Sequence, residues 1–442
     1  MNDLYRLTLR AAVTAIGGGA IAAADYARAC LKRNARLDAQ IGAWAWLDAE
    51  RVMSKAEQAD ASRADLRAAG MALPPLLGIP VGIKDIIDTA GIPTRRGSPL
   101  FEQNIPQVSA SVVGKLEQAG AYVMGKTVTA ELAFLSPGKT RNPWNAAHTP
   151  GGSSSGSAAA MAAGFVPAAI GTQTNGSVIR PAAYCGVVGY KPSQGLIANS
   201  GIHPFSPTLD QVGTFTRSVA DAALLASALV ENIEDLAAAI IPLKASPRLG
   251  LVRSPVWHLA TPAQQQMLLD NANTLRAAGA LIDDITLPAI FEQGHAALRD
   301  IMLYEAAAVF RAYTLTQREQ LSALLKQFLD EGAKISETVY RDALQIRAAL
   351  QNELGHLMQR FDALITPPAT GEAPANLEST GDPAFCTLWS LTGAPAMVIP
   401  VGLGERGLPL GLQIVGAAHD DSRLLTVAAW CEARLPFSSL AF

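Results

Sequence analysis

The order of hydrophobic and polar residues along this chain changes repeatedly between the spacing of helices and that of strands. Apolar residues three and four positions apart predict amphipathic helices near the N-terminus, over residues 4–15, 22–33 and 48–69. Further helices are predicted over residues 109–119, 218–230, 262–278 and 422–433. Short apolar runs bounded by turn residues predict strands in 81–88, 121–125, 185–190, 210–216, 248–252, 280–285, the first part of 362–368, 391–401 and 410–415.

Helical and strand patterns alternate through most of the chain. This order predicts an α/β protein in which one large mixed sheet is covered by helices on both faces. The chain has no internal repeat and no linker, so we expect a single domain over residues 1–442. We expect it to comprise N-terminal helices in 1–70, a catalytic core in 71–290 and 362–442, and a variable helical segment in 291–361 that shapes a substrate pocket.

Composition narrows the class of protein. The 442 residues are 49% hydrophobic and 17% charged, and the net charge of −3 is not concentrated in blocks. This balance fits a globular protein with a large core, and argues against binding to nucleic acid or to an anionic membrane. The four cysteines are far apart and no Cys/His group has metal-ligand spacing. We therefore expect reduced thiols, no metal and no cofactor.

The N-terminal region is apolar over residues 11–24, which invites comparison with a signal peptide. Three glycines interrupt this stretch at 17–19, and a helical pattern continues beyond it. No run of 18 apolar residues predicts a membrane span. The sequence therefore predicts a cytoplasmic protein.

The stretch 151–181 has an unusual composition. Two glycine-flanked serine clusters, 151–157 and 171–177, lie on either side of a run of small residues that predicts a tightly packed helix. The stretch has almost no charge before Arg180, so we expect it to be buried. Glycine lets backbone N–H groups come close to a reacting atom. These features are typical of a nucleophile beside an oxyanion-binding loop.

Lys84 is a second anomaly, because it lies inside the apolar run 81–88. A buried ammonium group either pairs with an anion or loses its proton. From the strand context alone, pairing with Asp85 or Asp88 is the favoured interpretation.

Several chemistries remain open for these residues. A serine nucleophile commonly uses a histidine, yet only His148 is near and no G-x-S-x-G elbow is present. A desolvated lysine can act as the base instead, with a second serine relaying the proton. The glycine-rich run lacks the pattern of a P-loop or a dinucleotide site, so phosphate binding is disfavoured. A purely structural role in helix packing is the remaining alternative.

Long motifs carry a resemblance to a known family over nearly the whole chain. They are GIPVGIKD at 78–85, TPGGSSSGS at 149–157 and GTQTNGSVIRP at 171–181, supported by GYKPS at 189–193 and TGAPA at 392–396. With these motifs in this order, the chain resembles the amidase signature family of Ser-Ser-Lys amide hydrolases. Residues 177–186 look most similar to the malonamidase-type hydrolases of small amides.

The resemblance implies roles for individual residues. Ser177 is implied as the nucleophile, Lys84 as the base, and Ser153 as the relay serine that follows a cis peptide bond from Gly152. The backbone N–H groups of residues 174–177 (Thr174, Asn175, Gly176 and Ser177) are implied to hold the oxyanion. Ser154 is expected as a supporting hydrogen-bond group and substrate contact.

Two positions depart from the family pattern. Asn175 stands where the family commonly has glycine; asparagine tolerates positive φ, so we expect the loop to survive, with its side chain narrowing the pocket. Gln173 stands where the family often has aspartate, so it can orient the loop but cannot pair with Arg180 as an ion.

Arg180 therefore has two interpretations, a scaffold residue or a ligand for a substrate carboxylate. Arg95 and Arg96 could add to an anion-attracting pocket, although loop arginines are more often solvated.

The expected function is hydrolysis of a small amide, which carries a carboxylate in our hypothesis, through an acyl-enzyme. The alternatives are an amidotransferase A-type subunit that releases ammonia from glutamine, and a hydrolase of esters or carboxylated urea. A non-catalytic binding paralogue is the alternative of another class. The family resemblance also implies a homodimer.

Overall fold

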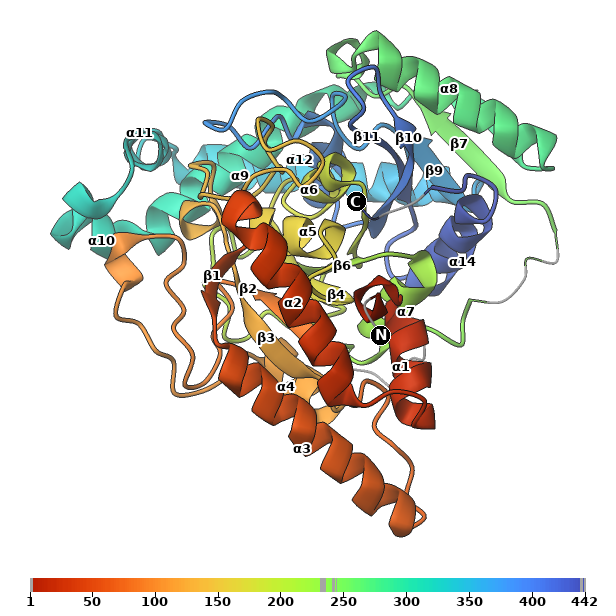
Figure 1. The fold of residues 1–442 in the computed structure, drawn as a ribbon. Helices are drawn as coiled ribbons and strands as arrows, with labels where there is room; N and C mark the ends of the chain where they lie inside the picture. The colour runs from red at the N-terminus through yellow and green to blue at the C-terminus, as the bar shows by residue number, and fades with distance from the viewer. Residues whose placement is uncertain (1–2, 231–235, 241–242, 244, 438–439, 441–442) are drawn as a thin grey trace.

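The computed structural model describes residues 3–230, 236–240, 243, 245–437 and 440. Within these residues, eleven strands form one mixed sheet. Figure 1 shows how the strands and helices are arranged. Their order across the sheet is β1 (Trp44–Leu47), β3 (Tyr122–Thr127), β2 (Pro80–Lys84), β4 (Ala168–Gln173), β6 (Gln211–Thr216), β5 (Val188–Lys191), β10 (Ala396–Leu403), β11 (Pro409–Val415), β9 (Ala363–Thr366), β7 (Arg248–Val252) and β8 (Leu281–Ile285).

The central strands differ from the outermost strand β8 in composition and burial. Every residue of β2, β3, β4 and β6 is buried, which explains why β2, β3 and β4 consist mainly of small and apolar residues without polar alternation. In β8, Asp283 and Asp284 are exposed. Charged side chains on an outermost strand discourage pairing with another chain.

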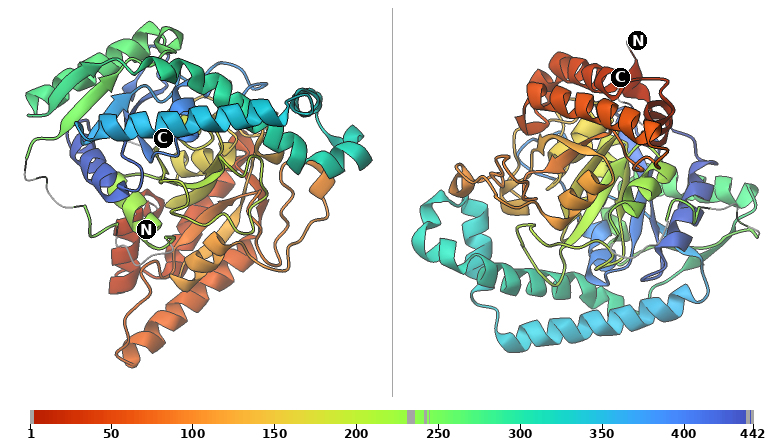
Figure 2. Two further views of the ribbon diagram at one scale, coloured as in Figure 1. Left: turned by 180° about the vertical axis from the view of Figure 1, so that it is seen from behind. Right: turned by 90° about the horizontal axis from the view of Figure 1, so that it is seen from below.

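Helices lie on both sides of the sheet, which confirms the predicted α/β fold with a mixed sheet (Figure 2). The N-terminal helices α1 (Leu9–Gly18), α2 (Ala23–Ile41) and α3 (Ala49–Ala68) lie on the opposite side from the helices of residues 294–358. That second group comprises α9 (Gly294–Val309), α10 (Arg311–Thr316), α11 (Ala323–Gly332) and α12 (Glu337–Met358). In the part of the chain that the structure describes, no helix has the length and apolar character needed to cross a bilayer.

Other helices connect or flank the strands. They are α4 (Ser111–Gln118), α5 (Ser155–Ala162), α6 (Ile179–Cys185), α7 (Val219–Ser227), α8 (Pro262–Ala277), α13 (Ala384–Leu391) and α14 (Asp421–Glu432). The small-residue run therefore forms a helix, α5, as predicted.

Four elements were not predicted. They are β1, β4, α6 and α13, and residues 391–395 end a helix and turn rather than begin a strand. The strand β1 has only four residues, and every residue of β4, α6 and α13 is buried. Without an exposed face, these segments lack the polar positions that reveal a helical or strand period in the sequence.

Close packing around α5 depends on Gly156. A Cβ atom at this position would lie 2.3 Å from the carbonyl oxygen of Ala43 and 2.3 Å from the backbone nitrogen of Val128. The Gly156 N–H donates to the Val128 carbonyl at 2.9 Å, which fixes the start of α5 against the end of β3. No side chain fits without movement of the backbone.

We therefore expect Gly156→Ala to lower the free energy of unfolding by about 1–3 kcal/mol, because overpacking forces the backbone apart. Urea unfolding followed by circular dichroism measures this change. Gly355→Ala is the matched control, since Gly355 lies exposed within α12 and a Cβ there meets nothing within 4 Å. The control should gain about 0.5–1 kcal/mol from helix propensity. Equal urea midpoints for Gly156→Ala and the unaltered protein would contradict the packing argument.

Candidate active site

Lys84 is the last residue of β2, which lies between β3 and β4 in the sheet. Strand β2 runs parallel to β4, with Ile83 opposite Ile170, so both strands end at the same edge. This arrangement brings Lys84 close to Thr172 near the end of β4. The Lys84 Nζ donates to Thr172 Oγ1 at 2.8 Å and to Ser153 Oγ at 2.8 Å.

Lys84 is fully buried and, among the described residues, has no carboxylate within ion-pair distance. The expected pairing with Asp85 or Asp88 is therefore wrong. Asp85 lies 3.7 Å from the Nζ of Lys126, and Asp88 pairs with Arg96 at 3.1 Å. Burial lowers the pKa of Lys84 to about 7, against a smaller upward effect of the Asp210 charge. The neutral amine is thus accessible near neutral pH, unlike that of an exposed lysine.

Ser153 connects Lys84 to Ser177. The Ser153 Oγ donates to Ser177 Oγ at 3.0 Å, and the peptide bond between Gly152 and Ser153 is cis. Ser153 precedes α5, and its carbonyl accepts from the Ala130 N–H at 3.0 Å. Lys84 and Ser153 have no exposed surface, whereas Ser177 is 9% exposed. The three side chains form one hydrogen-bonded row, of which Ser177 is the end that reaches the surface.

Gln173 and Thr174 fix the segment that carries Ser177. The Gln173 Oε1 accepts from the N–H groups of Val178 and Ile179 at 2.8 and 3.0 Å, and its Nε2 donates to Ser390 Oγ at 2.9 Å. Gln173 thus orients the loop as expected and does not contact Arg180. The Thr174 Oγ1 donates to Asp210 Oδ1 at 2.6 Å.

The backbone of residues 174–177 is available to a ligand. In the described part of the chain, the N–H groups of Thr174, Asn175, Gly176 and Ser177 donate to no protein acceptor. Neither Asn175 nor Gly176 has a positive φ, so the tolerance of asparagine for a left-handed backbone is not called upon at position 175. Glycine is required at 176 for space, because a Cβ would lie 2.9 Å from the Cβ of Pro383. The Asn175 Oδ1 accepts from Thr387 Oγ1 at 3.0 Å.

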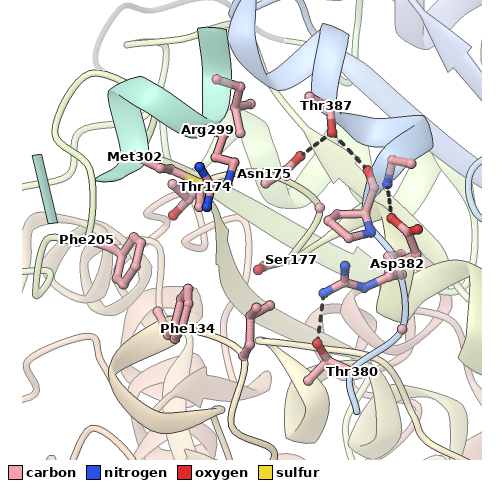
Figure 3. Close-up of a pocket in the computed structure, with 18 of the residues that line it drawn as sticks. Phe134, Thr174, Asn175, Ser177, Phe205, Arg299, Met302, Thr380, Asp382 and Thr387 are labelled. Carbon is pink, nitrogen blue, oxygen red and sulfur yellow. Dashed lines mark hydrogen bonds between the residues drawn. The ribbon is translucent and has the colours of Figure 1, made fainter. Parts of the chain in front are cut away.

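Ser177 opens into a cavity of about 430 Å³, here called the Ser177 cavity. Figure 3 shows Phe134, Phe205 and Met302 on one side of Ser177, and Thr380, Asp382 and Thr387 on the other. The remaining lining residues are Ala133, Leu135, Thr174, Asn175, Gly176, Arg180, His295, Leu298, Arg299, Leu324, Phe328, Glu378, Ser379, Gly381, Pro383 and Ala384. Six of the lining residues come from the segment 294–332, which belongs to the helices opposite the N-terminus.

Arg180 lies in α6, is 2% exposed and borders the Ser177 cavity. Its Nη2 donates to the Gly152 carbonyl at 2.8 Å and to Thr380 Oγ1 at 3.2 Å. Its Nε and Nη1 have no hydrogen-bond partner, and within the described residues no carboxylate pairs with it. Burial lowers the pKa of Arg180. Among the described residues, the guanidinium is thus buried without an ion-paired carboxylate, although the nearby charge of Asp382 acts to raise the pKa of Arg180.

Several other residues that the sequence singled out lie elsewhere. Ser154 was expected to contact substrate, but its Oγ is buried and donates to the Thr172 carbonyl at 3.1 Å, so it supports the strand and does not line the cavity. Arg95 pairs with Glu102 at 3.2 Å and Arg96 with Asp88, so neither is part of the Ser177 cavity. The ring of His148 lies 2.7 Å from the Ala373 carbonyl and meets no serine.

A sequence model described as Amidase matches residues 25–425. The chain belongs to the amidase family. It is 33% identical to the A subunit of the glutamyl-tRNA(Gln) amidotransferase from Chloroflexus aggregans, over 97% of this chain and 96% of the relative. The corresponding protein from a Synechococcus strain is 33% identical over 93% of this chain and 94% of that relative.

Solved structures give the same family. The peptide amidase of Stenotrophomonas maltophilia superposes with a TM-score of 0.85 and 29% identity, over 98% of both chains. A crystal structure described as an amidase has a TM-score of 0.86 and 31% identity, over 97% of this chain and all of that one. The predicted amidase signature membership is confirmed, and the chain is an amidase-family hydrolase of amide C–N bonds.

Two residues of this amidase site were missed by sequence reasoning. Thr172 touches the Lys84 amine, and Asp210 holds Thr174 and influences the Lys84 charge. Thr172 stands one residue before Gln173, within a motif that the sequence does reveal. Asp210 gave no usable signal, because an aspartate before a short strand is common in loops.

We predict that Asp210→Asn lowers the pKa of Lys84 below about 7, because the substitution removes the negative charge that favours the ammonium form. NMR of the ¹³C-labelled lysine side chain, titrated between pH 5 and 10, measures this pKa. Asp382→Asn is the control, since Asp382 lines the cavity without affecting the Lys84 charge. An unchanged or raised Lys84 pKa in Asp210→Asn would disprove the electrostatic link.

Proposed function

We propose that this amidase hydrolyses a small amide bearing a carboxylate, with Ser177 as nucleophile, Ser153 as relay and Lys84 as base. One observation carries the proposal. The row Ser177 Oγ, Ser153 Oγ and Lys84 Nζ has separations of 3.0 and 2.8 Å, and only its Ser177 end opens to the cavity. A hydroxyl can both donate and accept, so such a row can pass a proton in either direction.

In the acylation step, the neutral Lys84 amine takes the proton of Ser153 while Ser153 takes that of Ser177. The Ser177 oxygen then bonds to the amide carbonyl carbon and forms a tetrahedral oxyanion. The N–H groups of residues 174–177 donate to no acceptor among the described residues and belong to the segment that carries Ser177, so they are suited to stabilise the developing charge. Burial of Lys84 supports this step, because it keeps the amine available as a base near neutral pH.

In the second half, Ser153 donates its proton to the departing nitrogen and regains one from Lys84. The C–N bond breaks, and Ser177 remains esterified to the acyl group. Water then attacks the ester carbon and gives a proton to Ser153, which passes its own to Lys84. As the ester C–O bond breaks, a proton returns from Lys84 through Ser153 to the Ser177 oxygen, and the acid is released. The reaction needs no metal or cofactor, because each proton leaves and returns through these three side chains.

The carboxylate preference rests on Arg180. Its Nε and Nη1 have no partner, although the group is buried beside the nucleophile, and a buried charge of this kind favours a bound anion. Its bond to the Gly152 carbonyl also supports a scaffold role, since Gly152 directly precedes Ser153.

A second candidate function is release of ammonia from glutamine for an amidotransferase complex. The A subunits of two glutamyl-tRNA(Gln) amidotransferases are 33% identical to this chain over nearly its full length, which favours this candidate. Glu378 and Asp382 line the same cavity as Arg180, so groups of both charges are available to an amino acid. Ammonia release from glutamine, by this chain alone or only with partner proteins, would distinguish it from a free-standing amidase.

The direct test is ammonia release from malonamate, acetamide and glutamine. We expect Ser177→Ala to reduce kcat/KM by about 10⁴-fold or more, and Lys84→Met to have a comparable effect. For the unaltered protein, kcat/KM should rise with pH through about 7 as Lys84 loses its proton. Wild-type rates in Ser177→Ala, or a rate that falls as pH rises through 7, would refute the mechanism.

Arg180→Met separates the two roles of this arginine. If Arg180 binds a carboxylate, kcat/KM for malonamate should fall about 10- to 100-fold more than that for acetamide, as expected for loss of a charge-assisted hydrogen bond. If Arg180 serves only to hold Gly152, both substrates should lose activity by the same factor.

A further inference from the structure

We infer that the preferred amide carries an aromatic or branched apolar group, which lies against a wall formed by Phe134, Phe205, Phe328 and Met302. This inference rests on the proposed function, since it concerns the same cavity. It adds a second recognition element, separate from the Arg180 guanidinium, and assigns the helices of residues 294–332 a role in substrate choice.

The wall belongs to an apolar cluster that is distinct from the main core of the protein. Its buried members are Leu132, Phe134, Phe205, Ala306, Phe310, Leu321, Leu325 and Leu329, with Met302 and Phe328 packed on it. The Phe134 ring stacks on Phe205 with 5.3 Å between centroids and lies 4.6 Å from Phe328. Such ring pairs form a firm surface of fixed shape.

Backbone geometry holds Phe134 in this wall. Leu132 and Ala133 have φ values of 49° and 64°, a left-handed conformation that is unfavourable for residues other than glycine. Local hydrogen bonds maintain it, because the Leu132 N–H donates to the Arg96 carbonyl at 2.9 Å and the Phe134 N–H to the Glu131 carbonyl at 2.7 Å. Unfavourable backbone of this kind clusters where a protein shapes a ligand site.

The arrangement of the cavity matches an amide with two unlike ends. In Figure 3, Phe134, Phe205 and Met302 lie on one side of Ser177, while Thr380 and Asp382 lie on the other. An amide carbonyl held at Ser177 therefore directs its two substituents toward surfaces of different polarity. The polar side suits a carboxylate or another polar group, and the aromatic side suits an apolar one.

The size of the cavity supports the same conclusion. A volume of about 430 Å³ lies within the range of pockets that enclose drug-sized ligands, and exceeds what a small dicarboxylic half-amide needs. The apolar lining also extends to the surface, where Leu135 and Leu324 are 37% and 44% exposed. Exposed apolar residues at a cavity mouth are typical of an entrance for an apolar ligand.

The test compares acetamide with 2-phenylacetamide, which carries the ring on the acyl side, and acetanilide, which carries it on the amine side. In the unaltered protein, we expect kcat/KM for one phenyl compound to exceed that for acetamide by about 10- to 100-fold. Phe328→Ala should lower the ratio of kcat/KM for that phenyl compound to kcat/KM for acetamide by about tenfold, because it removes an aromatic face of the wall. Because the ratio is taken within one preparation, partial unfolding of the variant does not affect it.

Phe101→Ala is the matched control. Phe101 is half-buried and packs on the same apolar cluster, but it does not line the Ser177 cavity. This variant should keep the phenyl preference of the unaltered protein. Phe328→Leu should keep most of it, since leucine preserves an apolar contact.

Binding to Ser177→Ala distinguishes failure of this inference from failure of the proposed function. Calorimetric titration should show that one phenyl compound binds at least tenfold more tightly than acetamide, and that Phe328→Ala in the same background abolishes the difference. Hydrolysis that depends on Ser177 without any phenyl preference in rate or binding would overturn the apolar wall alone. Phenyl-selective binding with no hydrolysis of any amide would support the wall and refute the proposed function.

Discussion

The candidate active site depends on an amine that is buried without a counter-ion among the described residues. In this part of the chain, three lysines are fully buried at or near strand ends, and each has a different set of partners. Lys126 lies near Asp85 and donates to the Ile87 carbonyl, while Lys191 donates to two backbone carbonyls and a side-chain amide oxygen, which can only accept. Lys84 meets only the hydroxyls of Ser153 and Thr172. Because a hydroxyl can donate as well as accept, this environment suits the amine in either charge state.

That environment requires backbones to approach closely, and glycine makes the approach possible. A Cβ at Gly171 would lie 2.7 Å from the Oγ of Ser154, and one at Gly156 or Gly176 would also meet neighbouring atoms within 3 Å. These glycines let the segment before α5 and the segment after β4 lie side by side above β2. The row of Lys84, Ser153 and Ser177 is therefore a consequence of tight packing between segments that side chains would force apart.

The sheet and the helices of residues 294–358 contribute differently to the site. The sheet and its adjoining loops hold Lys84, Ser153 and Ser177, and the hydrogen bonds that Gln173 accepts from the backbone of residues 178–179 fix the loop from within. The helices supply side chains that line the cavity, such as Met302 and Phe328. These two side chains also pack on the separate apolar cluster. The row of Lys84, Ser153 and Ser177 can thus be kept while the residues that line the cavity are substituted, without disturbing the sheet.

The sequence by itself determined the fold class and most strands and helices. The glycine/serine clusters and a lysine among apolar residues stand out locally, and the family resemblance of these motifs then singled out Lys84, Ser153 and Ser177 as the residues to inspect. It could not determine partners. The sequence context favoured Asp85 for Lys84, yet the parallel register of β2 and β4 brings Thr172 to the amine and leaves Asp85 near Lys126. Likewise, α6 and α13 showed no helical period of polar and apolar residues, because they are buried on all sides. The aromatic wall joins Phe134, Phe205 and Phe328, which are far apart in the chain. Only the tertiary structure decided these contacts, since burial and strand register arise from long-range packing that no local pattern records.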